Sequence, residues 1–328
     1  MNPKLNRRGF LTRSVLASAG VGLASARAAE PTNRSAQPPA DTRAVVPASK
    51  GTLPTGKLGK LTVSRLISGG NLISGWAHSR DLHYVPSLMR HYNTEEKVLD
   101  TLQLLEEHGV NSIIADPRKN VMQVLARYWK ERGGKIQWIA EGHPEIDDWK
   151  TDLKRSIDFG AAAVYVQGVK SDQFYRAGRL DLVGNCVGFI KSHGLPGGIG
   201  AHKLEVIIES EKNKLGADFY VKTLHHTDYW SARRPDQNAD VVDNSADNYW
   251  DLEPKKTAAF MQEVEKPWVA FKVLAAGAIR PESGFRYAFE NGADFICVGM
   301  FDFQVEENVA LVRKLLPQAQ NRERAWMV

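Results

Sequence analysis

Residues 218–230 read DFYVKTLHHTDYW, and this stretch decides the fold that the sequence predicts. A short run of aromatic and β-branched residues is typical of a buried strand, and a histidine pair and a polar loop follow it. Lys222 stands inside the apolar run, between Val221 and Thr223. Buried lysines are rare and costly unless they are paired or put to use. The stretch therefore predicts a buried strand that carries a paired or functional lysine.

The same pattern of helix, glycine and apolar strand recurs along the chain. The word Gly216-Ala217-Asp218-Phe219 returns as Gly292-Ala293-Asp294-Phe295. Glycine just past a helix adopts the left-handed conformation at no steric cost, and strands that alternate with helices favour a parallel sheet. The rival fold, an open doubly wound sheet, lacks the GxGxxG turn after its first strand. We therefore predict an α/β chain with a single (β/α)8 TIM barrel. Its expected strands are Ser64–Gly69, Ser112–Asp116, Ile136–Glu141, Ala162–Gln167, Gly197–His202, Phe219–Leu224, Val269–Leu274 and Phe295–Gly299.

The N-terminal residues predict an export signal followed by a linker. Arg7-Arg8 precede Phe10-Leu11 and a short apolar run, which Ala26-Arg27-Ala28 closes. This order is typical of a cleavable signal peptide, and its Arg-Arg-x-Phe-Leu core resembles the twin-arginine motif. Residues 30–50, rich in Pro, Ala, Ser and Thr, predict a disordered linker. We expect a signal peptide over residues 1–29, cleaved near Ala28, periplasmic export by the twin-arginine machinery, and a barrel domain over residues 51–328.

Composition limits the classes of partner. The 328 residues carry a formal net charge of +5, part of it near the N-terminus, which does not indicate nucleic acid. No later run reaches the roughly 18 apolar residues of a membrane span. Cys186 and Cys297 lie far apart and form neither a disulfide framework nor a CxxC metal site. We expect a small-molecule substrate, and the oligomeric state stays open.

Histidines and a carboxylate at the expected strand ends indicate a metal site. Glu141 ends the third strand with His143 two residues further on, and His202 ends the fifth. The carboxyl ends of barrel strands meet at the mouth where barrel enzymes place their chemistry. Imidazole and carboxylate ligands suit a divalent transition metal such as Zn, Mn, Fe or Ni. No local motif such as HExxH supports the site, so acid–base roles for these residues are the alternative.

Two lysines inside apolar strands indicate a second kind of chemistry. Strand alternation places Lys222, in phase with His226, and Lys272, in phase with Ala270, toward the barrel mouth. Burial lowers the pKa of an amine, which makes it a Schiff-base nucleophile or a general acid. A buried ion network with carboxylates is the alternative. The predicted catalytic residues are Lys222, Lys272, Asp116, His226 and Gln167.

Residues 225–253 form the longest interruption of the repeating pattern. A loop of this length is usually a lid, an interface or a binding segment, although a mobile insertion is the alternative. Aromatic faces in this loop suit sugars and other flat ligands. The predicted substrate-binding residues are Asn71, Tyr165, His225, Trp230 and Trp250.

Two stretches in the first third of the chain resemble the aldo-keto reductases. Residues 61–71 (LTVSRLISGGN) resemble the first strand of that family, and residues 106–111 (EEHGVN) resemble the end of its first helix. The resemblance implies a barrel and NAD(P)-dependent carbonyl reduction with a tyrosine acid and its lysine. Here Asp116 is displaced and no tyrosine follows it, while Glu141 and Gln167 stand where the family has its lysine and histidine. We expect this chain to share the fold of that family. A transition metal is a stronger expectation for its cofactor than NAD(P).

The mature chain also resembles uncharacterised twin-arginine-exported barrel proteins of environmental bacteria. These patterns predict an exported barrel enzyme that acts on a small polar, carbohydrate-like substrate by metal- or lysine-assisted acid–base chemistry, as a lyase, isomerase or hydrolase. Two alternatives stay open. One is an NAD(P)-dependent reductase with a divergent site, and the other is a non-catalytic barrel whose aromatic loop captures a ligand.

Overall fold

The computed structural model describes residues 51–237, 239–243, 246–248 and 251–327. The predicted signal peptide and linker, with the cleavage position near Ala28, lie outside these residues, as does Trp250. Among the described residues, no helix has both the length and the apolar character to cross a membrane.

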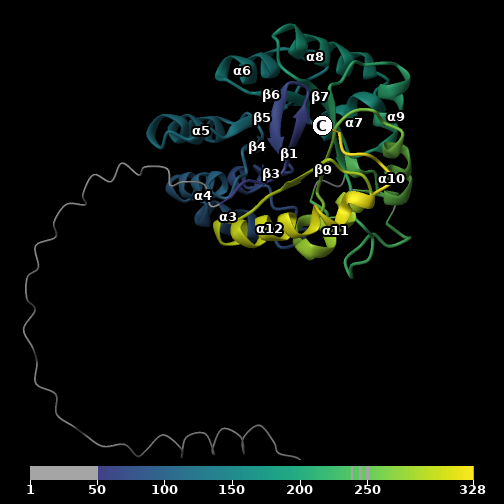
Figure 1. Cartoon of the computed structure of the whole chain (residues 1–328). Coiled ribbons are helices and arrows are strands. Elements are labelled where there is room, and N and C mark those ends of the chain that lie inside the picture. Colours follow the sequence, from purple (N-terminus) through teal and green to yellow (C-terminus); the bar gives the residue numbers. More distant parts are fainter. Residues whose placement is uncertain (1–50, 238, 244–245, 249–250, 328) are drawn as a thin grey trace, which may run out of the picture. The chain divides into compact units, whose positions relative to one another are not determined.

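Eight parallel strands close into a barrel, as the repeating pattern predicts. Their order around the barrel is β10-β3-β4-β5-β6-β7-β8-β9, so neighbours in sequence are neighbours in space. Each predicted strand has a counterpart, although the seventh ends at Phe271 and not at Leu274, and helices surround the strands (Figure 1). The strands are β3 (Leu66–Gly69), β4 (Ser112–Ala115), β5 (Gln137–Gly142), β6 (Ala163–Val166), β7 (Gly197–Ala201), β8 (Phe219–Thr223), β9 (Trp268–Phe271) and β10 (Phe295–Val298).

The helices present apolar stripes to the outside of the barrel. In α4 (Glu95–Glu107) these are Val98, Leu99, Leu102 and Leu105, all buried. Thr94 is the N-cap of this helix, because its hydroxyl accepts the Lys97 N–H at 3.3 Å. The other helices are α2 (Asn71–Ser74), α3 (Val85–Tyr92), α5 (Lys119–Glu131), α6 (Thr151–Phe159), α7 (Gly168–Arg176), α8 (Leu180–Ser192), α9 (Leu204–Lys212), α10 (Pro254–Gln262), α11 (Pro281–Glu290) and α12 (Asp302–Leu315), with short 3₁₀ turns η1 (Val241–Asp243), η2 (Ala275–Gly277) and η3 (Gln318–Asn321).

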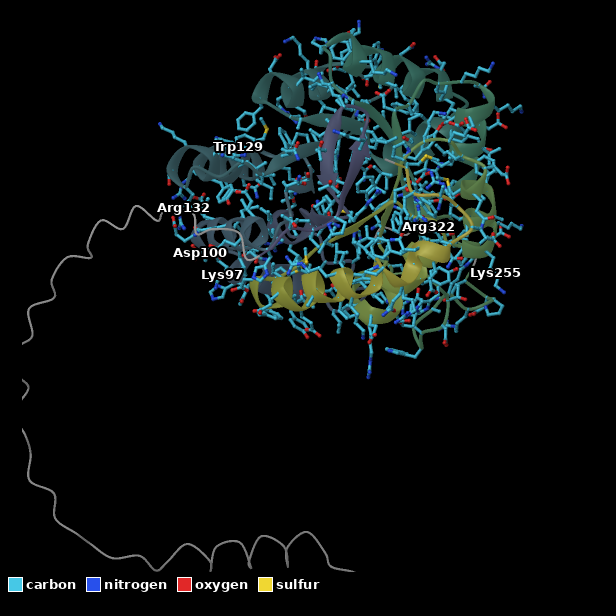
Figure 2. All side chains as sticks on the ribbon, in the orientation of Figure 1. Lys97, Asp100, Trp129, Arg132, Lys255 and Arg322 are labelled. Atoms are coloured by element: carbon cyan, nitrogen blue, oxygen red, sulfur yellow. The ribbon has the colours of Figure 1, made fainter. Side chains whose placement is uncertain are left out.

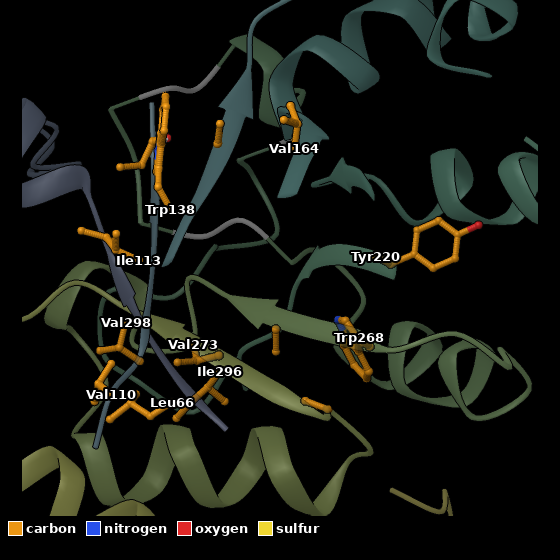
Figure 3. Close-up of a cluster of buried hydrophobic side chains, with 14 of the residues drawn as sticks. Leu66, Val110, Ile113, Trp138, Val164, Tyr220, Trp268, Val273, Ile296 and Val298 are labelled. Atoms are coloured by element: carbon orange, nitrogen blue, oxygen red, sulfur yellow. The ribbon is translucent and has the colours of Figure 1, made fainter. Parts of the chain in front are cut away.

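Two apolar layers lie on opposite faces of the barrel strands. The outer layer packs strand residues such as Trp138, Tyr220 and Trp268 beneath the helices (Figure 3). The inner layer fills the barrel with Ile114, Ile139, Tyr165, Phe219, Val221, Val269 and Phe295. The two layers assign each strand residue to the inside or the outside of the barrel.

A β-hairpin that the sequence reading does not predict closes the N-terminal end of the barrel. Its strands β1 (Thr55–Leu58) and β2 (Leu61–Ser64) pair antiparallel, and Leu58 and Val63 join the inner apolar layer. The hairpin therefore fills this end of the barrel with apolar side chains, and the C-terminal ends of the strands remain as the mouth.

The C-terminal segment reinforces the closed end. Asp294, at the start of β10, is fully buried and pairs with Arg322 at 2.9 Å and Arg324 at 2.6 Å. The Asp294 carboxylate also accepts the backbone N–H groups of Trp268 and Met327. In Figure 2, Arg322 lies nearer the centre of the barrel than the labelled Lys97, Asp100 and Lys255, which lie at its outer margin. At this end of the barrel, the cost of burying the Asp294 carboxylate is offset by opposite charges and hydrogen bonds.

Candidate active site

A cavity of about 250 Å³ opens at the mouth of the barrel. Side chains from six strand ends and from the segment after β3 line it. Barrel enzymes carry their chemistry at this end of the strands. The polar groups that line the cavity are Asn71, His78, Glu141, Tyr165, Lys272, Cys297 and Gln304.

Lys272 brings an amine into this cavity. Burial lowers the pKa of Lys272 to about 7, and the negative charge of Glu141 only partly offsets that effect. The Nζ atom lies 2.9 Å from Nε2 of His78. An amine with this pKa is partly neutral at pH 7 and can act as a nucleophile or exchange protons.

Lys272 reaches the cavity because the backbone leaves the strand at this residue. Ala270, two residues earlier, belongs to the outer apolar layer, so strand alternation alone would turn Lys272 toward the helices. Lys272 instead has a φ of 58°, in the left-handed region that L residues rarely adopt. Lys272 therefore lies at the mouth, as predicted. Strand alternation, from which the prediction was made, does not place it there.

His78 enters the site on the segment after β3. Residues His78 and Arg80 both have positive φ, at 48° and 53°. The Nε2 atom of His78 also lies 3.4 Å from Nδ2 of Asn71, at the start of α2. Arg80 binds the long loop, through Asp247 Oδ1 at 2.6 Å and the Ser231 carbonyl at 2.7 Å. This segment therefore joins the loop to the Lys272 amine.

Glu141 and Tyr165 face each other inside the barrel. They are register partners on β5 and β6, and both line the cavity. Burial raises the pKa of the Tyr165 hydroxyl well above its ordinary value, and the nearby Glu141 raises it further. Tyr165 therefore stays protonated and can donate a hydrogen bond to an oxygen in the cavity.

Lys222 lies outside this cavity, contrary to the prediction. Tyr220, two residues before it, faces the outer layer, whereas Val221 faces the barrel interior. The Lys222 amine donates to the Thr223 hydroxyl at 2.7 Å and pairs with Asp251 at 3.6 Å. Burial lowers the pKa of Lys222, and Asp251 opposes that effect. The alternative of a buried ion pair with a carboxylate fits Lys222, and its partner is Asp251.

The predicted metal ligands are not brought together as a set. His202 Nδ1 lies 2.8 Å from Asp172 Oδ2, and its ring packs against Phe271. Nε2 of His143 lies 4.0 Å from Oε2 of Glu141. Within the described part of the chain, no group of three His, Cys, Asp or Glu side chains is placed to hold a metal ion.

Three other predicted residues stabilise local structure. His225 is buried, and its Nε2 accepts the Asp251 N–H at 3.0 Å. His226 Nε2 lies 2.9 Å from the Ser283 hydroxyl, and His226 does not line the cavity. The Gln167 side chain accepts the Lys170 N–H and so caps α7. These contacts assign His225 and His226 to the loop and Gln167 to a helix cap.

The remaining predicted residues lie in the cavity, beside it or on the surface. Asn71 lines the cavity beside His78, as expected for a substrate-binding group. Asp116 lies just beyond it and accepts hydrogen bonds from Ser74 and Trp76. Trp230 is 95% exposed and lines no part of the cavity.

Sequence reasoning missed His78, Asp172 and Asp251. His78 lies within residues 71–84, which carry no strong periodic pattern, and its partner Lys272 is far away in the chain. Asp172 lies on α7, and Asp251 lies in the long loop. The residues Asp251 and Lys222 could have been linked only by knowing that β8 turns Lys222 outward.

Comparison with known proteins supports the fold. No family model and no curated protein matches the sequence. The solved structures that match include a candidate aldo-keto reductase from Pseudomonas aeruginosa, at 17% identity and a TM-score of 0.53, over 81% of this chain and 98% of that one. A second structure with the same description and organism matches at 16% identity and 0.53, over 83% and 98%. Likeness at this level shows a shared barrel fold.

Proposed function

We propose that the chain is a barrel enzyme that acts on a small polar, carbohydrate-like carbonyl compound through the amine of Lys272. The observation that carries the proposal is a lysine whose pKa is lowered to about 7 by burial, inside a cavity at the barrel mouth. At pH 7 roughly half of such an amine is neutral and nucleophilic. The cavity volume of about 250 Å³ suits a compound of a few carbon atoms.

The proposed chemistry uses groups that line the cavity. The neutral Nζ of Lys272 adds to the carbonyl carbon, and the resulting carbinolamine loses water to give a protonated imine. A neighbouring bond then breaks, either a C–H bond or the C–C bond to a carbon that bears a hydroxyl, and its electron pair passes to the imine nitrogen to give an enamine. Glu141 takes the proton from that carbon or that hydroxyl, and the Tyr165 hydroxyl donates a hydrogen bond to a substrate oxygen. Glu141 then returns a proton to the enamine carbon, and hydrolysis of the imine so formed releases the product and restores the lysine, so these steps support a lyase or an isomerase.

The reductase alternative fits the cavity less well. A tyrosine that donates its proton to a carbonyl works best beside a cation, which lowers its pKa. Tyr165 instead faces the carboxylate of Glu141, and burial and that charge both raise its pKa. The arrangement favours a hydrogen-bond donor that keeps its proton.

Export belongs to the same proposal. Arg7-Arg8, the apolar run and Ala26-Arg27-Ala28 support a twin-arginine signal peptide. Protein recovered from the periplasm is expected to start near residue 29. Retention of the full chain in the cytoplasm, with its first residues intact, would contradict export.

Borohydride trapping tests the catalytic proposal. The protein is incubated with pyruvate, dihydroxyacetone, glyceraldehyde or small keto-sugars, reduced, and digested for peptide mass analysis. We expect one stable adduct, on Lys272, and its loss in Lys272→Met. Lys154→Met is the matched control, because Lys154 lies on the surface, where its amine pairs with Asp158. Adducts confined to surface lysines, or an unchanged yield in Lys272→Met, would contradict the proposal.

A further inference from the structure

A second cavity, of about 290 Å³, opens at the same end of the barrel, beyond the ends of β4 and β5. Three cationic side chains, Arg118, Lys119 and Arg155, line it together with His143. We call these four residues the basic subsite. Two carboxylates, Asp116 and Asp152, also line this cavity.

The two carboxylates are already supplied with donors. Asp116 accepts hydrogen bonds from the Ser74 hydroxyl at 2.6 Å and Trp76 Nε1 at 3.3 Å, and pairs with Arg118 Nε at 2.9 Å. Asp152 accepts the His143 N–H at 2.7 Å and pairs with Arg155. A guanidinium has five N–H donors, more than these pairings use. The cavity therefore offers donors and a net positive charge to a ligand.

His143 adds a ring nitrogen that makes no hydrogen bond within the described residues. Its Nε2 atom is shielded from solvent and makes no hydrogen bond to a described residue, since the closest carboxylate oxygen of Glu141 lies 4.0 Å away. Burial lowers the pKa of His143, but the carboxylates around it, Glu141 first, raise it by more.

The first turn of α5 strengthens the positive potential. Arg118 is its N-cap residue, the turn holds no acidic side chain, and no side chain caps the helix. Cations at a helix N-terminus are unfavourable, because that end already carries partial positive charge, and a bound anion relieves the repulsion.

The basic subsite adjoins the Lys272 cavity. Trp76 lines the Lys272 cavity, donates to Asp116, and has the Arg118 guanidinium stacked 4.5 Å from its ring centroid. At the end of β5, Glu141 lines the Lys272 cavity, and His143, two residues later, lines the cavity of the basic subsite. A molecule bound at the mouth can therefore meet both groups of residues.

We propose that the basic subsite binds the carboxylate or phosphate group of the substrate whose carbonyl reacts with Lys272. The substrate class is then an anionic carbonyl compound, such as a keto acid or a phosphorylated keto-sugar. Guanidinium groups recognise both anions with paired N–H donors. The inference rests on the proposed function, because it assigns the second half of the same substrate.

Concentration dependence of borohydride trapping tests the inference. Pyruvate and dihydroxyacetone phosphate are the anionic probes, and dihydroxyacetone is the neutral one. We expect half-maximal modification of Lys272 at concentrations at least about tenfold lower for one of the anions than for dihydroxyacetone. The anion that reaches half-maximal modification of Lys272 at the lower concentration shows whether the basic subsite binds a carboxylate or a phosphate. Equal concentrations for all three probes would overturn the inference.

Variants assign the effect to the basic subsite. Arg155→Gln should reduce the preference for the anion about tenfold, and the exposed Lys119→Gln a few-fold. Arg179→Gln is the control, since Arg179 is a half-exposed arginine that also pairs with a carboxylate, that of Asp181, and lines neither cavity. A preference that survives in the double variant Lys119→Gln/Arg155→Gln would overturn the inference.

Direct binding separates this inference from the proposed function. If no carbonyl compound modifies Lys272, the proposed function fails, and calorimetric titration with inorganic phosphate still decides the subsite. Binding by the wild-type protein that the Lys119→Gln/Arg155→Gln double variant loses supports an anion site. No binding, or equal binding by both proteins, overturns it.

Discussion

The two ends of the barrel bury charge in opposite ways. At the closed end, Asp294 meets Arg322 and Arg324 and accepts two backbone N–H groups as well. At the mouth, Lys272 meets His78 and feels the charge of Glu141, and its pKa still falls to about 7. At the closed end each buried guanidinium lies within 2.9 Å of a carboxylate oxygen, whereas at the mouth the effect of burial on the Lys272 amine exceeds the attraction of Glu141. The closed end therefore serves stability, and the mouth has a group suited to chemistry.

The largest expected effect is at the closed end. Asp294→Asn leaves two buried guanidinium groups without their counter-charge, and we expect a loss of about 3–5 kcal/mol in the free energy of unfolding. Urea denaturation measures it. Asp158→Asn, on the surface, should change stability by less than about 0.5 kcal/mol. A similar small change for Asp294→Asn would remove the contrast between the two ends.

The two lysines are expected to respond with opposite signs. Lys222→Met strands the buried Asp251 carboxylate and should cost about 3 kcal/mol. Lys272→Met removes a poorly compensated charge and should raise stability by about 1 kcal/mol or more at pH 6, where this lysine is charged in both the folded and unfolded states. The gain should shrink from pH 7 toward pH 10.5, because the folded protein then holds Lys272 neutral. Urea denaturation at pH 6 and at pH 10.5 measures the stability of the two variants. An equal loss of stability in Lys222→Met and Lys272→Met would contradict the account.

A smaller effect is expected where the long loop meets the mouth. Arg80→Ala removes the contacts with Asp247 and Ser231 and leaves the barrel strands untouched. We expect faster amide hydrogen exchange in residues 225–253, with global stability changed by less than about 1 kcal/mol. Unchanged exchange in the loop would show that Arg80 does not hold it.

The smallest expected effect is at Trp230. Its side chain is 95% exposed, so Trp230→Ala should change the free energy of unfolding by less than about 0.5 kcal/mol and leave Lys272 trapping unchanged. Urea denaturation and the trapping assay measure the two quantities. Lost trapping would return this residue to the substrate-binding role that the sequence predicts.

The barrel was predictable from sequence because its units repeat. Glycine caps and short apolar strands mark each unit, and all eight strands are confirmed. The hairpin over residues 55–64 was not predicted, because it stands outside the repeat. The positions of Asn71, Glu141, Tyr165 and Lys272 at the mouth were also predictable, since the ends of parallel strands converge.

The orientation of side chains was less predictable. Strands of a parallel barrel are apolar on both faces, so periodicity does not tell the inside from the outside, and Lys222 was assigned to the wrong face. No residue-type signal marks the left-handed backbone at Lys272. The partners His78, Asp172 and Asp251 come from distant segments, and only the folded chain brings them to their lysine or histidine.

The ionisation of Lys272 is the most direct test of the account. Competitive labelling of amines with acetic anhydride across pH 5–11, followed by peptide mass analysis, reports the pKa of each accessible lysine. We predict a midpoint near 7 for Lys272, well below the ordinary lysine value of about 10.4. A midpoint for Lys272 near that ordinary value would contradict the claim that the mouth holds a reactive amine.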